Sequence, residues 1–536
     1  MRRRIVVGIV VSLALALLGV SGCSSSSSSA TSTVVSAPPA VSSTTPTSGA
    51  ASAAITSTVT ASFSQAMNAS TVNSSSMMLT GPGGAAVAGA VTYSSVGSLA
   101  TFTPAASLAY STAYTATITI GATSSAGYAL GSNYTWNFTT AASTSVAGQG
   151  TDTVDFGTSQ QTIRGFGGST AFMPSMTVAQ ASALFGNASS QQLGLSMLRV
   201  RIDPGGSSNW GTELGNAQEA QALGVSVMAT PWTPPASMKS NNSTIAGTLN
   251  TGSYAAYAAY LESFVTYMAN GGVNLYGISM QNEPDANVTY ESCSWTGSTM
   301  DSWIANNASV LTTKLIMPES QNFITGYSDP ALNDTQALGH IAIVAGHIYG
   351  VSPSYYTNAE TLGKDVWMTE HYLLPSGAQP GISDALAAAK EIHDSMTVAS
   401  YNAYFWWWVA DWNAGTGVTN YGLVDTNNNP TFYGYALGQY AKFVRPGYVR
   451  TNATYNPNAN IYVSAYKGGG HYVIVALNLG SSSVSQPFAI QNQTLTSLTP
   501  YTTTAAGGLA QQTAVSVSNN TFTYTLPAMS ITTFVQ

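Results

Sequence analysis

The strongest constraint on the fold is a repeated order of strand and helix through the middle of the chain. Between residues 152 and 448, apolar strand-like runs alternate with helix-like segments such as AAYAAYLESFVTYMANG and SDALAAAKEIHDSMTVA. Eight such strands over about 250 residues predict an α/β fold, a (β/α)8 barrel. The strand-like runs are TIRGFGGS (162–169), LSMLRVRID (195–203), VSVMATPWTPP (225–235), LYGISMQNEP (275–284), KLIMPES (314–320), AIVAGHIYG (342–350), KDVWMTEH (364–371) and AYFWWWV (403–409).

Segments of all-β character flank this barrel. Residues 51–141 contain short runs rich in Thr, Val, Tyr and Phe with turn residues between them, which predicts an N-terminal β-sandwich. Its pieces ASFSQAMNAST and NYTWNFTT resemble bacterial Ig-like modules, and we expect a spacer, with glycan binding as the alternative. Residues 142–151 read as a linker, and residues 449–536 as a C-terminal β-sandwich side domain.

The N-terminus predicts export. Residues 1–22 combine a basic start, a short apolar run and small residues, and V-S-G-C resembles a bacterial lipobox. This implies lipidation of Cys23, a Ser/Thr/Pro-rich tether over 23–50, and a secreted protein anchored to the bacterial outer membrane or cell surface. An ordinary signal peptide is the alternative. Because Cys293 is the other of only two cysteines, we expect no disulfide.

The composition excludes some partners. Only 7% of residues are charged, and 14 Lys and Arg face 21 Asp and Glu, so the chain does not suit the phosphate backbone of nucleic acid. Its 29 Tyr and 10 Trp suit neutral sugars better. GFGGST lacks dinucleotide-binding spacing because residue 170 is Thr, and the five His form no metal-binding pattern. We therefore expect a monomer without a cofactor or metal.

Two glutamates stand at the ends of strand-like runs. Glu283 ends the fourth run and Glu370 the seventh, and the active site of such a barrel lies at the C-terminal ends of its strands. Hydrolysis of a glycosidic bond needs one carboxyl group as acid and a second as nucleophile or base. The pair therefore predicts a glycosidase. The alternative is that each glutamate is a structural ion-pair partner at the mouth of the barrel.

Several motifs in order carry a more specific resemblance. GFGGS, RVRID, PWTPPASMKSN, ISMQNEPD, YESCSWT, GHIYG, GKDVWMTEHY and AYFWWW resemble glycoside hydrolase family 30, in its bacterial xylanase branch. The resemblance runs from about residue 152 to the C-terminus and implies a retaining, endo-acting enzyme that cleaves β-1,4-xylan. It implies that Glu283 is the general acid/base, that Glu370 is the nucleophile, and that Asn282 binds the sugar 2-hydroxyl.

The same resemblance implies further substrate contacts. Trp232, Trp406 and Trp407 would offer stacking faces for sugar rings, and His347 and Tyr349 would lie beside the nucleophile. One of the three consecutive tryptophans 406–408 must point away from the barrel interior, so not all of them can contact sugar. His371 falls on the other face of its strand from Glu370, and we expect it to be structural.

One departure from the resemblance bears on specificity. Glucuronic acid-dependent xylanases of this branch usually carry an Arg just after the tryptophan run, but no Lys or Arg lies between Tyr401 and Lys442, and Asp411 stands there instead. We therefore expect no strict need for glucuronic acid branches, with Trp412 and Tyr421 as neutral sugar contacts. Two alternatives stay open: a β-1,6-glucanase, galactanase or glucosylceramidase-like activity on this scaffold, or a non-catalytic glycan-binding surface lipoprotein.

Overall fold

A computed structural model describes residues 37–54, 57–105, 108, 112–140, 150–410 and 420–536. The chain divides into two compact units, residues 1–142 and 143–536. The predicted signal peptide, Cys23, half of the predicted tether, most of the predicted linker, and the loop with Asp411 and Trp412 lie outside the described residues. In the described part, no helix combines the length and the apolar character needed to cross a membrane.

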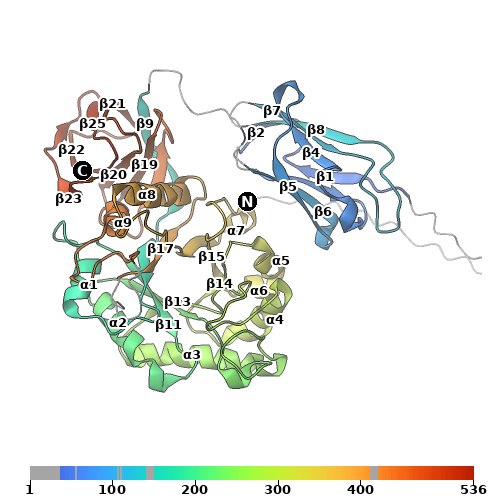
Figure 1. The fold of residues 1–536 in the computed structure, drawn as a ribbon, viewed down its shortest axis with the longest axis horizontal. Helices are drawn as coiled ribbons and strands as arrows, with labels where there is room; N and C mark the ends of the chain where they lie inside the picture. Colours follow the sequence, from blue (N-terminus) through green and yellow to red (C-terminus); the bar gives the residue numbers. More distant parts are fainter. Residues whose placement is uncertain (1–36, 55–56, 106–107, 109–111, 141–149, 411–419) are drawn as a thin grey trace, which may run out of the picture. The chain divides into compact units, whose positions relative to one another are not determined.

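The N-terminal unit is a sandwich of two sheets, with strand orders β1-β3-β6-β5 and β2-β8-β7-β4 (Figure 1). Trp136 and Phe138 lie in the core between the sheets. The sandwich starts at Val41 rather than at residue 51, because a Ser/Thr/Val-rich stretch that reads as a tether forms β1. The strands are β1 (Val41–Thr45), β2 (Ala50–Ala53), β3 (Val59–Phe63), β4 (Met77–Thr80), β5 (Gly89–Ser94), β6 (Leu99–Pro104), β7 (Ala113–Ile118) and β8 (Tyr134–Thr140).

The predicted barrel is confirmed. Eight of the described strands, β10 to β17, run parallel and close into a ring because β10 pairs with both β11 and β17. Each strand coincides with one of the eight predicted runs. Their bounds are β10 (Gly165–Ser169), β11 (Met197–Ile202), β12 (Ser226–Pro231), β13 (Leu275–Ser279), β14 (Lys314–Ser320), β15 (Ile341–His347), β16 (Asp365–Glu370) and β17 (Ala403–Trp408).

Two apolar layers hold the barrel together. Inside the ring, Trp367 lies against Phe405 and Tyr276, with centroid distances of 6.0 and 5.4 Å, so the interior is a packed core rather than a pore. At β10 the strands approach so closely that a Cβ on Gly167 would collide with the Met197 carbonyl oxygen. A second, larger core fills the space between the ring and the surrounding helices.

The helices surround the strands, as Figure 1 shows. Two of them begin with a capping box, at Thr177 and at Thr296, in which a side chain satisfies otherwise free backbone N–H groups. The helices are α1 (Val178–Phe185), α2 (Gly211–Gln221), α3 (Tyr254–Asn270), α4 (Gly297–Asn307), α5 (Asp329–Asn333), α6 (Thr335–Leu338), α7 (Thr357–Thr361), α8 (Ile382–Thr397) and α9 (Phe432–Ala441).

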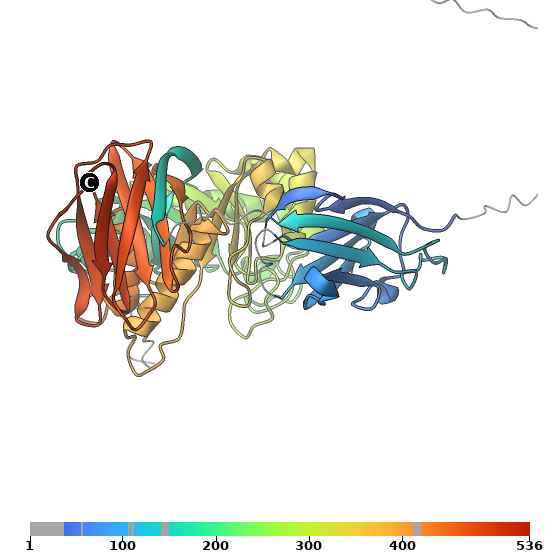
Figure 2. The same ribbon diagram turned by 90° about the horizontal axis from the view of Figure 1, so that it is seen from above.

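The side domain contains one strand that the sequence assigned to the barrel. β9 pairs with β18 and β21, so residues 152–162 belong to this domain (Figure 2). Phe488 of β21 contacts Phe534 of β26 at 5.5 Å although the strands are not neighbours, so the sheet folds over its own core. The strands are β9 (Asp152–Thr162), β18 (Val449–Ala453), β19 (Ile461–Gly468), β20 (His471–Asn478), β21 (Val484–Gln491), β22 (Ser497–Thr504), β23 (Gly507–Gln511), β24 (Val515–Ser516), β25 (Thr521–Leu526) and β26 (Ser530–Val535).

Candidate active site

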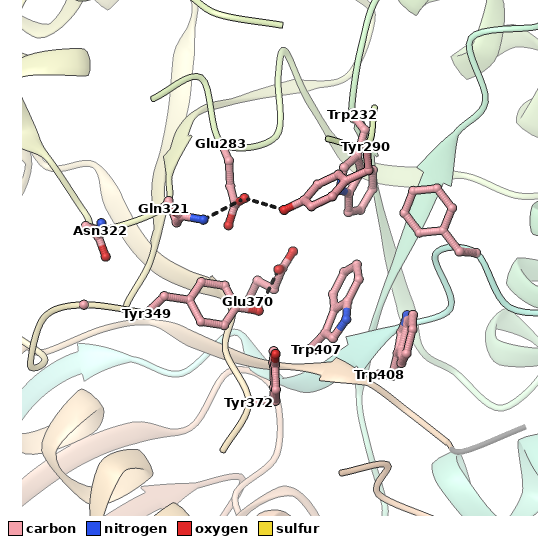
Figure 3. A pocket seen from close by; sticks show the side chains of 12 residues that line it. Trp232, Glu283, Tyr290, Gln321, Asn322, Tyr349, Glu370, Tyr372, Trp407 and Trp408 are labelled. Atoms are coloured by element: carbon pink, nitrogen blue, oxygen red, sulfur yellow. Dashed lines mark hydrogen bonds between the residues drawn. The ribbon is translucent and has the colours of Figure 1, made fainter. Parts of the chain in front are cut away.

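A cavity of about 760 Å³ lies where the barrel strands end at their C-terminal side (Figure 3). Both predicted glutamates line it. Glu370 is the last residue of β16, whereas Glu283 lies beyond the end of β13, in the loop that follows that strand. The other described lining residues are Phe172, Trp232, Tyr290, Gln321, Asn322, Tyr349, Gly350, Tyr372, Trp407 and Trp408.

The two glutamates lie close enough to act on one bond. An oxygen of Glu283, an oxygen of Glu370 and a ring nitrogen of His347 all lie within 4.8 Å of one another. Figure 3 shows the two carboxyl groups turned toward the same space. Retaining glycosidases hold their carboxyl groups about 5–5.5 Å apart, and inverting enzymes hold them about 6.5–9.5 Å apart to admit a water molecule. The separation therefore favours the retaining geometry.

The backbone around Glu283 is strained. Glu283 has φ +43° and Glu319, at the end of β14, has φ +54°, a conformation that non-glycine residues adopt at a cost of about 1–3 kcal/mol. The Glu283 N–H donates to the Glu319 carbonyl oxygen at 3.0 Å, so the two strained residues hold each other. Such strain persists only where the surrounding barrel fixes the chain, and here it orients the Glu283 side chain.

A fully buried arginine forms the floor of the site. Arg199 of β11 donates from Nη1 to Glu370 Oε2 at 2.6 Å and from Nη2 to Asn282 Oδ1 at 2.7 Å. Nη2 also lies 3.3 Å from Glu319 Oε1. A buried guanidinium is tolerated only when its charge is paired and its N–H groups are bonded. Arg199 thus links Glu370, Asn282 and a third carboxylate, that of Glu319.

His347 lies beside the predicted acid and carries a charge. Its Nδ1 is 3.0 Å from Glu283 Oε1, and its Nε2 is 3.8 Å from Glu319, a distance at which Glu319 acts through charge rather than a hydrogen bond. Burial alone would lower the pKa of His347, but Glu370, Glu283 and Glu319 together raise the pKa to about 9. At neutral pH the ring is therefore an imidazolium facing Glu283.

Glu319 is the counter-charge of the site. Burial would raise the pKa of this carboxyl, but Arg199 and His347 outweigh burial and lower the pKa to about 2. Thr230 donates to its second oxygen at 2.9 Å. Glu319 therefore stays ionised and balances one of the two buried cations, which leaves the charge of the other to be balanced by Glu283 and Glu370.

Both oxygens of Glu370 have donors. Tyr349 donates its hydroxyl to Oε1 at 2.7 Å, and Arg199 occupies Oε2. Burial raises the pKa of Glu370 above that of an exposed glutamate, while the charges of His347 and Arg199 and the Tyr349 hydrogen bond act in the opposite direction. The two donors fix the orientation of the Glu370 carboxylate.

The three consecutive tryptophans divide between core and cavity. Trp406 is 1% exposed, packs against Tyr433 and donates to the Tyr421 carbonyl, so the prediction that it stacks on sugar is wrong. The register between β10 and β17 shifts by one residue at Trp407, since Gly168 pairs with Trp406 and Ser169 with Trp408. This bulge turns both Trp407 and Trp408 to the cavity.

The other predicted substrate contacts also divide. Trp232 and Tyr349 line the cavity, as predicted. Asn282 and His347 are buried beside it and contact charged site residues instead. Tyr421 is not among the described lining residues and stacks on Tyr372 at 4.3 Å. His347 is fully buried, so its direct contact with sugar is corrected to a supporting position. Direct contact by Asn282 and by Tyr421 stays a prediction.

Sequence reasoning missed several residues of the site. Tyr290 and Gln321 approach Glu283 Oε2 with donor atoms at 3.4 and 3.3 Å, and both line the cavity (Figure 3). Arg199 and Glu319 lie inside two of the predicted strand runs, where the sequence reasoning gave them no role. A charge inside an apolar strand is costly unless it is paired, so the charge itself is a signal in the sequence that points to both residues.

Three side chains of the site are of the metal-binding type. Of the described residues, Glu283, His347 and Glu370 bring one ligand atom each within reach of a common point. Their surroundings oppose a cation, because the imidazolium of His347 and the guanidinium of Arg199 already face these carboxylates. The donor set fits acid–base chemistry better than metal binding.

The chain resembles known proteins in both units. A family model for bacterial Ig-like domains matches residues 35–140, and the model for the TIM-barrel domain of glycosyl hydrolase family 30 matches residues 212–381. A glucuronoxylanase of Bacillus subtilis is 40% identical over 395 residues, which is 72% of this chain and 91% of that protein.

Solved structures agree with this similarity. A family 30 subfamily 8 xylanase from Clostridium acetobutylicum is 42% identical, with a TM-score of 0.67 over 72% of this chain and 99% of that chain. A family 30 endoxylanase from Clostridium papyrosolvens is 40% identical, with a TM-score of 0.65 over the same shares. Each match covers nearly the whole of the relative, including the barrel and the side domain.

Proposed function

Because this chain belongs to glycoside hydrolase family 30, we propose that it is a retaining, endo-acting hydrolase of β-1,4-xylan. The observation that carries the proposal is the pairing of Glu283 and Glu370 across one aromatic cavity at a retaining separation. The relatives at 40–42% identity are named as a glucuronoxylanase and xylanases. The alternatives of β-1,6-glucan, galactan or glucosylceramide as substrate find less support.

In the first step Glu370 attacks the anomeric carbon of the bound xylose while Glu283 donates a proton to the glycosidic oxygen. The C–O bond to the leaving sugar breaks, and a covalent bond from Glu370 to the anomeric carbon forms. Arg199 and Tyr349 hold the attacking carboxylate in place. The Asn282 oxygen is occupied by Arg199, so its NH2 end is the one available to donate to the sugar 2-hydroxyl.

In the second step water replaces the departed sugar. Glu283, now a carboxylate, accepts a proton from this water while the water oxygen attacks the anomeric carbon. The bond between that carbon and Glu370 breaks, and Glu370 leaves as a carboxylate. His347 Nδ1 lies 3.0 Å from Glu283 Oε1, and this hydrogen bond holds the carboxyl group in place for the proton transfer. The other oxygen of Glu283, Oε2, accepts hydrogen bonds from Tyr290 and Gln321 on the cavity side, where the leaving sugar and then water would lie.

The cavity suits an uncharged sugar chain. Its described lining residues include no Lys or Arg. The nearby Arg201 is bonded to Glu291 and Asp203, and its guanidinium lies 4.6 Å from the centre of the Phe172 ring, so it is not available to a uronate. The loop 411–419 supplies no Lys or Arg by sequence. We therefore propose that glucuronic acid branches are not strictly required.

Two soluble xylans test the substrate, one with glucuronic acid branches and one without them. The wild-type chain is expected to cleave both with kcat/KM values within about tenfold of each other, since an unpaired carboxylate gains little from the cavity. Products are analysed by chromatography, and Glu370→Gln serves as the inactive control. Cleavage of the branched xylan alone would refute branch independence, and cleavage of neither would refute xylan as the substrate.

We also propose that Cys23 carries the lipid anchor. The support is the V-S-G-C sequence after a short apolar run. In a bacterial host, the wild-type chain is expected to incorporate a labelled fatty acid and to sediment with membranes, whereas Cys23→Ser should do neither. Labelling that persists in the Cys23→Ser variant, or an unlabelled wild-type chain, would contradict the anchor.

A further inference from the structure

A partly buried histidine–glutamate pair lies behind the proposed nucleophile. His371 directly follows Glu370, and its Nδ1 lies 2.8 Å from Glu391 Oε1 on α8. Because a carboxylate only accepts, the ring N–H donates to it. Tyr404 donates its hydroxyl to the same oxygen at 2.6 Å. Glu391 therefore fixes the orientation of the His371 ring from outside the barrel.

The His371 ring in turn supports a residue that touches the nucleophile. Its edge packs against Tyr349 with ring centroids 5.0 Å apart and an angle of 61° between the planes. Tyr349 donates to Glu370 Oε1. Tyr372 borders Tyr349 at 5.6 Å, so the tyrosine lies between two aromatic neighbours that limit where its hydroxyl can lie. A continuous set of contacts thus runs from Glu391 to the attacking carboxylate.

We propose that Glu391 is a positioning residue for hydrolysis, acting through His371 and Tyr349 on the nucleophile Glu370. The inference rests on the proposed function, because it assigns a role within the same site. It also gives His371, which we expect from the sequence to be structural, a part in positioning Tyr349. Glu391 contacts neither the cavity nor a catalytic glutamate, so its effect must pass through the orientation of the Tyr349 hydroxyl.

A purely structural pair would have a simpler purpose, to join α8 to the barrel. Apolar packing already does this, because Ala385, Ala389 and Ile392 of α8 are buried in the core between the helices and the ring of strands. Farther along the helix, Asp394 pairs with Lys390 of the same helix at 2.6 Å and accepts from Tyr455 at 2.7 Å, so it serves as a control. The hydrogen bond to Glu391 adds little to that packing, and orientation of the His371 ring is what it supplies.

A double-mutant cycle tests the pathway. The variants are Glu391→Leu, Tyr349→Phe and the double variant, each assayed on the xylan that the wild-type chain cleaves. Glu391→Leu is expected to lower kcat by about tenfold with KM within about twofold, since a small misplacement of a catalytic contact is costly. The double variant should have the kcat of Tyr349→Phe alone, because the tyrosine hydroxyl carries the effect.

Matched variants separate positioning from folding. Asp394→Asn removes a carboxylate from the same helix and should leave kcat unchanged, while Glu391→Gln keeps an acceptor for both donors and should restore most of the activity. If Glu391→Leu fails to fold, His371→Leu takes its place in the double-mutant cycle. An unchanged kcat in the folded Glu391→Leu variant, or losses that multiply in the double variant, would overturn the pathway. An inactive wild-type chain would refute the proposed function instead.

Discussion

Replacing Glu370 by alanine is expected to lower kcat on xylan by at least about 10⁴-fold, because no other carboxylate can attack the anomeric carbon from its position. Azide is small enough to enter the space left by the side chain. With an activated aryl β-xylobioside, azide should restore turnover and yield the α-glycosyl azide, since it attacks from the face that Glu370 occupied. Chromatography and NMR of the product report both rate and configuration.

The matched variant is Glu283→Ala. General acid catalysis contributes about 10²–10⁴-fold, so the loss on xylan should be large, but an activated aryl leaving group needs little proton donation and should still form the glycosyl-enzyme. Azide then attacks from the opposite face and gives the β-glycosyl azide. If Glu370→Ala gave the β-azide and Glu283→Ala the α-azide, Glu283 would be the nucleophile and Glu370 the general acid/base. Full activity in Glu370→Ala would refute its role as nucleophile, and binding of xylan without hydrolysis by the wild-type chain would support the non-catalytic alternative.

Glu319→Gln is expected to lower the free energy of unfolding at pH 7 by about 3–5 kcal/mol, because it leaves two buried cations with one fewer counter-charge. Arg199 and His347 lie 3.3 and 3.8 Å from this carboxylate. We expect kcat to fall as well, since Arg199 and His347, which contact Glu370 and Glu283, would lose the carboxylate that holds them in place. Denaturant titration and xylan assays measure the two effects.

The pH dependence of this loss has a defined sign. The folded pKa of Glu319 is about 2, below its ordinary value of 4.5, so its stabilisation is present above pH 4.5 and is lost as pH falls toward 2. The difference in stability between wild type and Glu319→Gln should therefore shrink over that range. A difference that stays constant from pH 7 to pH 2 would show that charge is not its cause.

Glu360 provides the control for Glu319, because in the described part of the chain its carboxyl group has no paired cation that stabilises its charge. Burial and the nearby Asp365 raise the pKa of Glu360 on α7 to about 7. Its ionised form is disfavoured in the fold, so Glu360→Gln should not destabilise the chain at pH 7. Equal losses for Glu319→Gln and Glu360→Gln would mean that burial of an amide, rather than removal of a paired charge, explains the result.

The barrel could be predicted because each strand is a local apolar run, and Glu370 could be placed because it ends one. Other features depend on contacts that no local pattern records. Arg199 hydrogen-bonds Asn282, which lies 83 residues away in the sequence, and Glu370, which lies 171 residues away. Strand β9 directly precedes the first barrel strand in the sequence, yet its partners β18 and β21 lie near the C-terminus. Pairing over such separations becomes visible only in the folded chain.

The tryptophans show a second limit. Side chains alternate along a strand, so a regular β17 would turn Trp407 inward and both of its neighbours outward. The bulge at Trp407 breaks this alternation, which brings Trp408 to the cavity while Trp406 stays in the core. A bulge depends on the register of the neighbouring strand β10, and a run of three identical residues gives no sign of it.

The stereochemistry of hydrolysis tests the central claim most directly. Proton NMR follows the anomeric signals of the first products released from a xylo-oligosaccharide, before they equilibrate in solution. Two displacements, by Glu370 and then by water activated by Glu283, predict that the β-anomer appears first and the α-anomer follows only by mutarotation. An initial burst of α-anomer would mean that water attacks directly, and it would contradict a nucleophilic Glu370.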